Sequence, residues 1–356
     1  MQCSIISFRN IASDYVDEKI NTTIKLLSSK GIFVSVILQI SDGKNAFTNV
    51  LHDCLNKYDY IFIIDNDTLN FSIADYLNTI TESETQFLYS IGNVRVFLLP
   101  DKFDLIEDYI KNATRIIKAK QGEYFGKTVL KAFCLDSSII NETILKAKKL
   151  GKNQLEIFCN SLNFDFTIEI VYNNQTPKLL IDDILRLINK ELFEYIYSLD
   201  GNSLSQSLYD ILSVRKLILS TAESFTGGGI ANKIVENSGA SSVFYEGVTA
   251  YSNKSKVQRL NVSQTTLNEF GAVSDQTAYE MACGLLETNN CNVAIATTGI
   301  AGPNSDNTNK PKGLCFIAIG YNKEIEIYKY FLKGDREEVT KTAINAAMFL
   351  TLKKIK

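Results

Sequence analysis

The chain has 356 residues, a single histidine (His52), no tryptophan, and 37 basic against 40 acidic residues, for a net charge of −3. One histidine excludes zinc sites built from two or three histidines and leaves room for at most one histidine-dependent hydrolase site. Because the chain has no basic surplus, we do not expect it to bind nucleic acid.

The seven cysteines are scattered and include no CxxC pair, which is typical of reduced thiols in a cytoplasm. No apolar run approaches the roughly 18 residues of a membrane span, and the first residues lack a signal-peptide pattern. We therefore expect a cytoplasmic protein of two or three domains that does not bind membranes.

The first 121 residues alternate short apolar runs with amphipathic ones, which predicts an α/β layer with a largely parallel sheet. His52 lies in one of the expected helices with no serine or cysteine nucleophile pattern beside it, so we interpret it as structural or exposed. The expected strands and helices are Cys3–Phe8, Tyr15–Ser29, Ile32–Ile40, Ala46–Asn56, Tyr60–Asp65, a hairpin over Gln86–Leu99, and Lys102–Lys118.

A polar segment at 118–123 marks a boundary, and a β-α-β-β-α pattern follows it. This order predicts a small α+β module over residues 122–200. Its expected elements are a strand Thr128–Leu135, a helix from Ser137 or Ser138, strands Leu155–Cys159 and Asp165–Tyr172, and a helix Ile181–Tyr197.

Residues 201–356 again alternate strands and helices, which predicts a second α/β domain. The expected helices are Ser203–Ser213, one after the glycines at 227–229, Lys254–Leu260, Thr265–Phe270, Asp275–Thr288 and Arg336–Leu350. The expected strands are Lys216–Thr221, Asn292–Thr297, Leu314–Ile319 and Glu324–Phe331.

The segment TAESFTGG, residues 221–228, places Ser224 where an apolar strand gives way to a helix. Ligands of open α/β sheets bind at the carboxyl ends of strands, and unpaired N–H groups of the following helix could hold an oxyanion or a phosphate. A serine that only caps the helix is the alternative, and it is the more frequent one for this pattern alone.

A second motif, YSNKSK at residues 251–256, begins 27 residues after Ser224 at an expected strand-to-helix junction. In a site without histidine, a lysine whose pKa is lowered by its surroundings can take the proton of a serine, and Tyr251 could relay it. Lys254 and Lys256 point to different sides of a helix, so only one faces Ser224. A solvated, charged first turn is the alternative interpretation.

Two further segments are weaker candidates. The loop TTGIAGP, residues 297–303, runs on to KPKG at 310–313, and its amides and hydroxyls suit a phosphate or a ribose. Arg336 stands at a helix start, where it could clamp a phosphate bidentately. An ordinary surface arginine in an acidic first turn is the more frequent arrangement there.

Together, TAESFTGG, YSNKSK, GAVS (271–274), TTGIAGP, KPKG and GDR (334–336) resemble, in order and approximate spacing, the C-terminal nicotinamide-nucleotide amidase domain of the CinA family. The resemblance implies hydrolysis of the carboxamide of nicotinamide mononucleotide to nicotinate mononucleotide and ammonia. It implies Ser224 as nucleophile, Lys256 as base and Tyr251 as an aid to proton transfer, without metal or cofactor. Phe225 stands where the family commonly has cysteine. The residues expected to bind the oxyanion or substrate are Thr226, Gly227, Gly228, Asn253, Thr298, Gly299, Ala301, Gly302, Lys310 and Arg336.

The first domain resembles the molybdopterin-binding-like domain of the same family, which in some members hydrolyses ADP-ribose with a divalent metal. The family's glycine-rich motifs are replaced here at residues 7–11, 64–70 and 98–105. Lost glycines mean lost close approach of backbone to phosphate, so we expect no pyrophosphatase activity and no metal site there.

We therefore expect an active amidase that assembles as a homodimer, with a degenerate N-terminal domain. Two alternatives stay open. One is a non-catalytic, competence- or damage-inducible interaction protein, and the other is an ADP-ribose pyrophosphatase that acts through the N-terminal domain.

Overall fold

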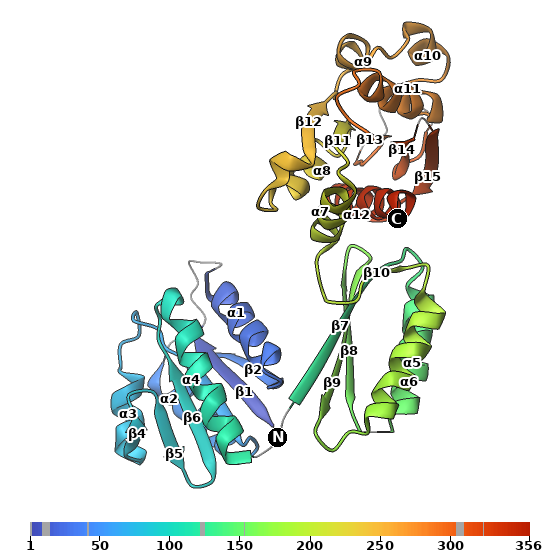
Figure 1. The fold of residues 1–356 in the computed structure, drawn as a ribbon. Helices are drawn as coiled ribbons and strands as arrows, with labels where there is room; N and C mark the ends of the chain where they lie inside the picture. Colours follow the sequence, from blue (N-terminus) through green and yellow to red (C-terminus); the bar gives the residue numbers. More distant parts are fainter. Residues whose placement is uncertain are drawn as a thin grey trace. The chain divides into compact units, whose positions relative to one another are not determined.

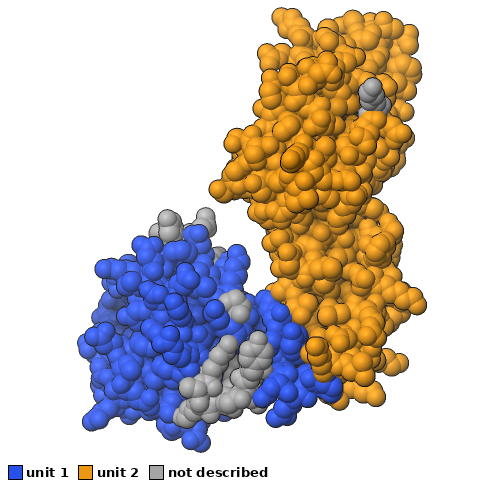
Figure 2. Space-filling view, viewed as in Figure 1, with its two compact units in different colours: residues 1–127, 171–177 blue, residues 128–170, 178–356 orange. Residues whose placement is uncertain are grey.

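The computed structural model describes residues 2–8, 15–40, 43–121, 125–152, 154–303, 310–322 and 324–356. These residues form three sheets with helices packed on them (Figure 1), which confirms the predicted α/β class. They divide into two compact units, residues 1–127 with 171–177 and residues 128–170 with 178–356 (Figure 2). The predicted division into three domains stays a prediction. Within the described ranges, no helix is long and apolar enough to cross a membrane.

The first unit contains a six-stranded sheet in the order β2-β1-β3-β6-β5-β4. The pairs among β2, β1, β3 and β6 are parallel, and β5 and β4 add antiparallel pairs. The strands are β1 (Cys3–Phe8), β2 (Val34–Ile40), β3 (Tyr60–Ile64), β4 (Ser83–Thr85), β5 (Leu88–Ile91) and β6 (Val94–Leu99).

Helices cover both faces of this sheet, and the central strands β1 and β3 are therefore buried on both sides. One core lies under α1 (Tyr15–Ser29) and α4 (Phe103–Gln121), and the other under α2 (Lys44–Leu55) and α3 (Ile73–Ile80). The hairpin of β5 and β6 is confirmed. Helix α3, which has eight residues, was not predicted; Ser72 caps it by accepting from Asp75 N at 3.1 Å. His52 lies exposed on α2.

A four-stranded sheet in the order β10-β7-β9-β8 follows, with α5 and α6 packed together beside it. The predicted β-α-β-β-α order is confirmed, but α6 ends earlier than predicted and β10 adds an antiparallel strand next to β7. The elements are β7 (Phe125–Phe133), α5 (Ser137–Gly151), β8 (Glu156–Leu162), β9 (Asp165–Asn173), α6 (Lys178–Leu192) and β10 (Ile196–Ser198).

The third sheet has five strands in the order β12-β11-β13-β14-β15. Strands β12, β11 and β13 are parallel, whereas β14 and β15 are antiparallel. The strands are β11 (Leu219–Glu223), β12 (Phe244–Thr249), β13 (Val293–Gly299), β14 (Leu314–Tyr321) and β15 (Glu324–Phe331).

Two helical layers enclose this sheet. Helices α7 (Leu204–Arg215), α8 (Gly229–Val235) and α12 (Arg336–Ile355) form one core with it, and Phe133 of β7 joins that core with its ring centroid 5.3 Å from that of Phe349. The opposite core lies under α9 (Asn253–Leu260), α10 (Gln264–Glu269) and α11 (Asp275–Leu286), and a short 3-10 turn spans Ala240–Ser242.

One glycine sets how closely the helices of this second layer approach each other. A Cβ added to Gly284 of α11 would lie 2.1 Å from the carbonyl oxygen of Leu260, at the end of α9. Only glycine therefore allows α11 to approach α9 this closely. Because the carboxyl ends of parallel strands meet at one edge of a sheet, the loops after β11, β12 and β13 are brought together there.

Candidate active site

Ser224 lies in a tight turn directly after β11. Its N–H donates to the carbonyl of Thr297 at 3.0 Å, which ties the turn to β13. The turn continues through Gly227 and Gly228, whose φ angles of 65° and 94° are conformations that side-chain-bearing residues rarely adopt. The side chain of Ser224 is held in a buried position, with the residue 8% exposed.

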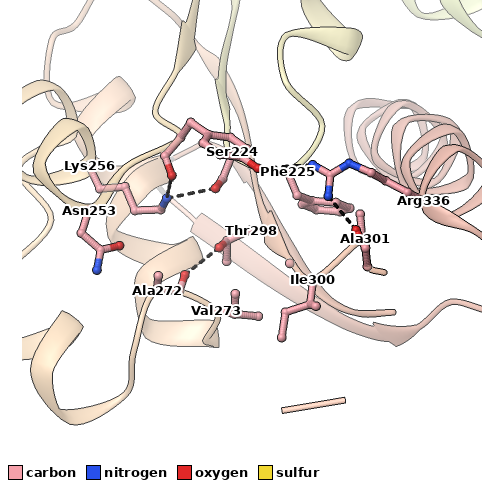
Figure 3. Close-up of a pocket in the computed structure, with 13 residues that line it drawn as sticks. Ser224, Phe225, Asn253, Lys256, Ala272, Val273, Thr298, Ile300, Ala301 and Arg336 are labelled. Atoms are coloured by element: carbon pink, nitrogen blue, oxygen red, sulfur yellow. Dashed lines mark hydrogen bonds between the residues drawn. The ribbon is translucent and has the colours of Figure 1, made fainter. Parts of the chain in front are cut away.

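Lys256 lies in the first turn of α9 and is 1% exposed. Ser252 caps this helix by accepting from Ser255 N at 3.1 Å. The Nζ of Lys256 lies 2.9 Å from Ser224 Oγ (Figure 3). It also lies 2.8 Å from the carbonyl oxygen of Ala250 and 3.3 Å from that of Tyr251. Lys254, two positions earlier, is exposed. The fold therefore brings Lys256, and not Lys254, to the serine.

Tyr251 lines the pocket, but its hydroxyl contacts Arg336 and not the serine–lysine pair. It is 64% exposed, and its hydroxyl accepts a hydrogen bond from Arg336 Nη2 at 3.2 Å. Only its backbone carbonyl contacts Lys256. Arg336 also donates from Nη1 to the carbonyl of Gly302 at 2.7 Å. The arginine thus joins the loops that follow β12 and β13, and the tyrosine hydroxyl is directed toward it.

These groups line a pocket of about 150 Å³. Lys256 and Arg336 lie on either side of Ser224 in the view of Figure 3, and no Asp or Glu is among the described residues that line the pocket. Its charged lining is therefore entirely cationic. The lining residues are Ser224, Phe225, Tyr251, Asn253, Lys256, Ala272, Val273, Thr298, Gly299, Ile300, Ala301, Gly302 and Arg336.

Four residues of the predicted site do not line this pocket. Gly227 N donates to Ser224 O at 3.1 Å, and Gly228 N donates to Glu223 Oε2 at 3.0 Å, so neither N–H is free to hold an oxyanion. The hydroxyl of Thr226 hydrogen-bonds that of Thr297 at 2.7 Å.

Lys310 is the fourth. Its Nζ donates to the carbonyls of Phe270 and Val273, each at 2.6 Å, so it holds the loop that precedes α11. Thr298 does line the pocket, but its hydroxyl donates to the carbonyl of Ala272 at 2.6 Å. These side chains shape the pocket wall by fixing the loops around it.

Glu223 and Phe225, on either side of Ser224, are not among the predicted site residues. Glu223 is 1% exposed and contacts the start of α8, and Phe225 lines the pocket while packing against Ala301 and Cys315. Burial raises the pKa of the Cys315 thiol to about 12, so this cysteine is not a thiolate nucleophile at neutral pH. The adjacency of both residues to Ser224 was visible in the sequence, but the direction of their side chains was not.

Fold and site together define an α/β domain with a buried serine–lysine pair at the carboxyl edge of its parallel strands. Residues 201–355 match the family model described as the CinA C-terminal domain. A putative competence-damage inducible protein of Caldicellulosiruptor saccharolyticus is 32% identical over 74% of this chain and 65% of its own length. The chain belongs to the CinA family.

Two solved structures are also similar. A competence-damaged protein (CinA) superfamily protein from Klebsiella pneumoniae is 31% identical and covers 43% of this chain and 95% of its own, with a TM-score of 0.42. A molybdopterin biosynthesis protein from Mycobacterium abscessus is 10% identical and covers 34% of this chain and 96% of its own, with a TM-score of 0.30. The chain spans 42% and 65% of the lengths of two curated relatives it matches.

Proposed function

We propose that the C-terminal domain hydrolyses the carboxamide of nicotinamide mononucleotide to nicotinate mononucleotide and ammonia. The observation on which this rests is the 2.9 Å contact between Lys256 Nζ and Ser224 Oγ, inside a pocket whose described lining includes Arg336 and no carboxylate. A neutral amine has two N–H donors and one lone pair. The carbonyls of Ala250 and Tyr251 can accept N–H groups of this amine, and its lone pair can then face the serine hydroxyl.

In the first half of the reaction, Ser224 Oγ forms a bond to the carboxamide carbon and its proton passes to Lys256 Nζ. The carbonyl oxygen becomes an oxyanion. The amides of Phe225 and Thr226, which donate to no acceptor within the described residues, are our candidates to hold it. The C–N bond then breaks, the nitrogen takes the proton from Lys256, and ammonia leaves an acyl ester on Ser224.

Water completes the cycle. It gives a proton to Lys256 as its oxygen attacks the acyl carbon, and the ester bond to Ser224 breaks with return of that proton to Oγ. The product is a carboxylate, so the net reaction consumes one water and releases one ammonia. Each step uses the same lysine, first as base and then as acid.

The pocket lining fits the two ends of this substrate. Phe225, Val273 and Ile300 provide apolar surface for a pyridine ring. Arg336 supplies a planar guanidinium that suits a phosphate, and the absence of carboxylates from the described lining leaves that attraction unopposed. Asn253 is our further candidate for a polar substrate contact.

The test is ammonia release from nicotinamide mononucleotide by the purified chain, beside Ser224→Ala. We expect release by the wild type and none above background by the variant. If the wild type releases no ammonia, the amidase proposal is wrong and a non-catalytic role becomes the favoured alternative. If Ser224→Ala releases ammonia at the wild-type rate, the nucleophile is assigned wrongly. ADP-ribose with and without divalent metal, assayed in parallel, tests the N-terminal domain, where we expect no turnover.

A further inference from the structure

Glu223 places a buried carboxylate against the turn that holds Ser224. It is the last residue of β11 and directly precedes the serine. Its carboxylate accepts hydrogen bonds from Gly228 N at 3.0 Å, Ile230 N at 3.1 Å and Ala231 N at 2.9 Å. The Thr221 hydroxyl donates to it as well, at 3.2 Å. Both ends of the Ser224 turn are therefore joined to one residue.

The carboxylate takes the place of a side-chain cap. The first N–H groups of a helix have no partner within the helix, and Gly228, at the N-cap position of α8, has no side chain to supply one. Glu223 satisfies these N–H groups from the strand before the turn. The start of α8 is thus used by the protein itself, and it is not left open for a substrate anion.

The backbone of Glu223 reaches the lysine as well. Its carbonyl accepts from Ala250 N at 2.8 Å, and the carbonyl of Ala250 lies 2.8 Å from Lys256 Nζ. One residue thus connects to Ser224 through the chain and the turn, and to Lys256 through a single intervening residue, Ala250. Because Glu223 is not among the residues that line the pocket, it acts through its neighbours and not on a substrate.

From these contacts we infer that Glu223 is a positioning residue, whose carboxylate fixes the distance between Ser224 Oγ and Lys256 Nζ. The inference rests on the proposed function for its chemical setting. Replacing the carboxylate with an amide puts an NH₂ group against the N–H groups of Gly228 and Ile230 or of Ala231. Donor then faces donor, and the turn must shift. A shift of about 1 Å in a catalytic group can lower a rate about 100-fold.

The experiment compares Glu223→Gln and Glu223→Asp with a matched control, Glu280→Gln. Glu280 also holds a helix start, accepting from Ser263 N at 2.7 Å and from the Thr266 hydroxyl at 2.5 Å, but it does not line the pocket. The first readout is the rate at which a fluorophosphonate labels Ser224. In that reaction Oγ bonds to phosphorus, fluoride leaves and the serine proton passes to Lys256. The second is kcat and KM for nicotinamide mononucleotide, and the third is the thermal midpoint.

We expect Glu223→Gln to lower the labelling rate and kcat about 100-fold, with KM within about threefold of wild type. Glu223→Asp keeps the carboxylate on a shorter side chain, so its labelling rate and kcat should lie between those of Glu223→Gln and the wild type. It provides the test if the glutamine variant does not fold. Glu280→Gln should lower the midpoint and leave both rates unchanged. Labelling by Glu223→Gln within about twofold of wild type overturns the inference, and so does an equal loss in Glu280→Gln.

Labelling also separates this inference from the proposed function. If the wild type is labelled at Ser224 but releases no ammonia, the substrate is wrong, and a slower labelling of Glu223→Gln still supports the positioning role. If the wild type is not labelled at all, Ser224 is not activated and the positioning role is overturned.

Discussion

The two α/β layers of this chain have the same construction but different polar groups at the carboxyl edges of their parallel strands. In the N-terminal sheet, the Lys19 ammonium forms an ion pair with Asp101, just after β6. Asp65, just after β3, accepts from the amide of Asn66 at 2.8 Å. In the C-terminal sheet, Lys256 contacts a serine hydroxyl and two carbonyls within a pocket.

The comparison shows which feature of such an edge indicates a site. Polar residues follow the strands in both sheets, so their presence alone does not distinguish an edge that carries a site from one that does not. In the first sheet, Lys19 is neutralised by Asp101 at this edge. In the second, Arg336 hydrogen-bonds a carbonyl and a phenol, and it forms no ion pair with a carboxylate in the described part of the chain. A cation directed into a pocket whose described lining holds no carboxylate is available to an anionic ligand.

The largest effect is expected from the two lysines of α9. Lys256→Met should lower ammonia release at least about a thousandfold, because it removes the base next to Ser224. Lys254→Met changes the same residue type two positions away, on the exposed side, and should retain activity within about twofold. Steady-state ammonia assays of both variants check this. A comparable loss in both would mean that general damage to α9, and not loss of the base, explains the effect.

The next test compares Arg336, which forms no ion pair within the described residues, with Lys19, which is ion-paired to Asp101. Arg336→Ala should raise KM for nicotinamide mononucleotide about 10- to 100-fold, because hydrogen bonds to a charged group contribute about 1.5–3 kcal/mol. The increase should be clearly smaller with nicotinamide riboside, which lacks the phosphate, although the hydrogen bonds of Arg336 to Gly302 and Tyr251 are lost with either substrate. Lys19→Ala, in the first sheet, should leave KM unchanged. Equal losses on nucleotide and riboside would contradict a phosphate contact.

Tyr251→Phe should have a smaller effect. The tyrosine hydroxyl is bonded to Arg336 and not to the serine–lysine pair, so its removal should lower kcat/KM by about threefold or less, mainly through KM. Kinetics on the mononucleotide measure this. A loss of kcat near 100-fold would show instead that the hydroxyl reaches the reacting atoms when substrate is bound, as the family resemblance implies.

The smallest effect concerns the first sheet alone. Burial raises the pKa of Asp65 above its ordinary value of 3.8, although the Asn66 amide partly opposes this. A carboxyl with a raised folded-state pKa stabilises the fold less as pH rises through that pKa. Asp65→Asn should therefore raise the unfolding free energy at pH 7 by less than about 1 kcal/mol, and the gain should vanish below pH 3.8. Urea unfolding at both pH values checks the sign, and a loss at pH 7 would contradict it.

Much of the fold could be predicted, because the spacing of apolar residues in a short stretch of sequence differs between strands and helices. The elements missing from the expected ranges are α3, β4, β10 and β12, of which β12 was expected only as the strand before the junction at Tyr251. Strand β10 depends on a distant contact, because it pairs with β7. A continuous apolar pattern likewise made α6 look longer than its observed end at Leu192.

Site residues could be predicted from the sequence where their spacing along a helix fixes the direction of their side chains. Two lysines separated by two positions must point apart on a helix, so one of them had to face away from Ser224. Side chains whose partners lie far along the chain were not predictable. Lys310 bonds carbonyls of Phe270 and Val273, some forty residues earlier, and the Tyr251 hydroxyl meets Arg336 from another element. The role of Glu223 could not be predicted, because the contact between its carboxylate and the start of α8 depends on a turn that is visible only in three dimensions.

The most direct test of the central claim is to trap the acyl intermediate. The wild-type chain would be mixed with nicotinamide mononucleotide, quenched in acid within one turnover, digested and analysed by mass spectrometry. We predict an ester of the nicotinoyl nucleotide on the peptide that contains Ser224, absent from Ser224→Ala. Turnover by the wild type with the adduct on a different residue would contradict the account.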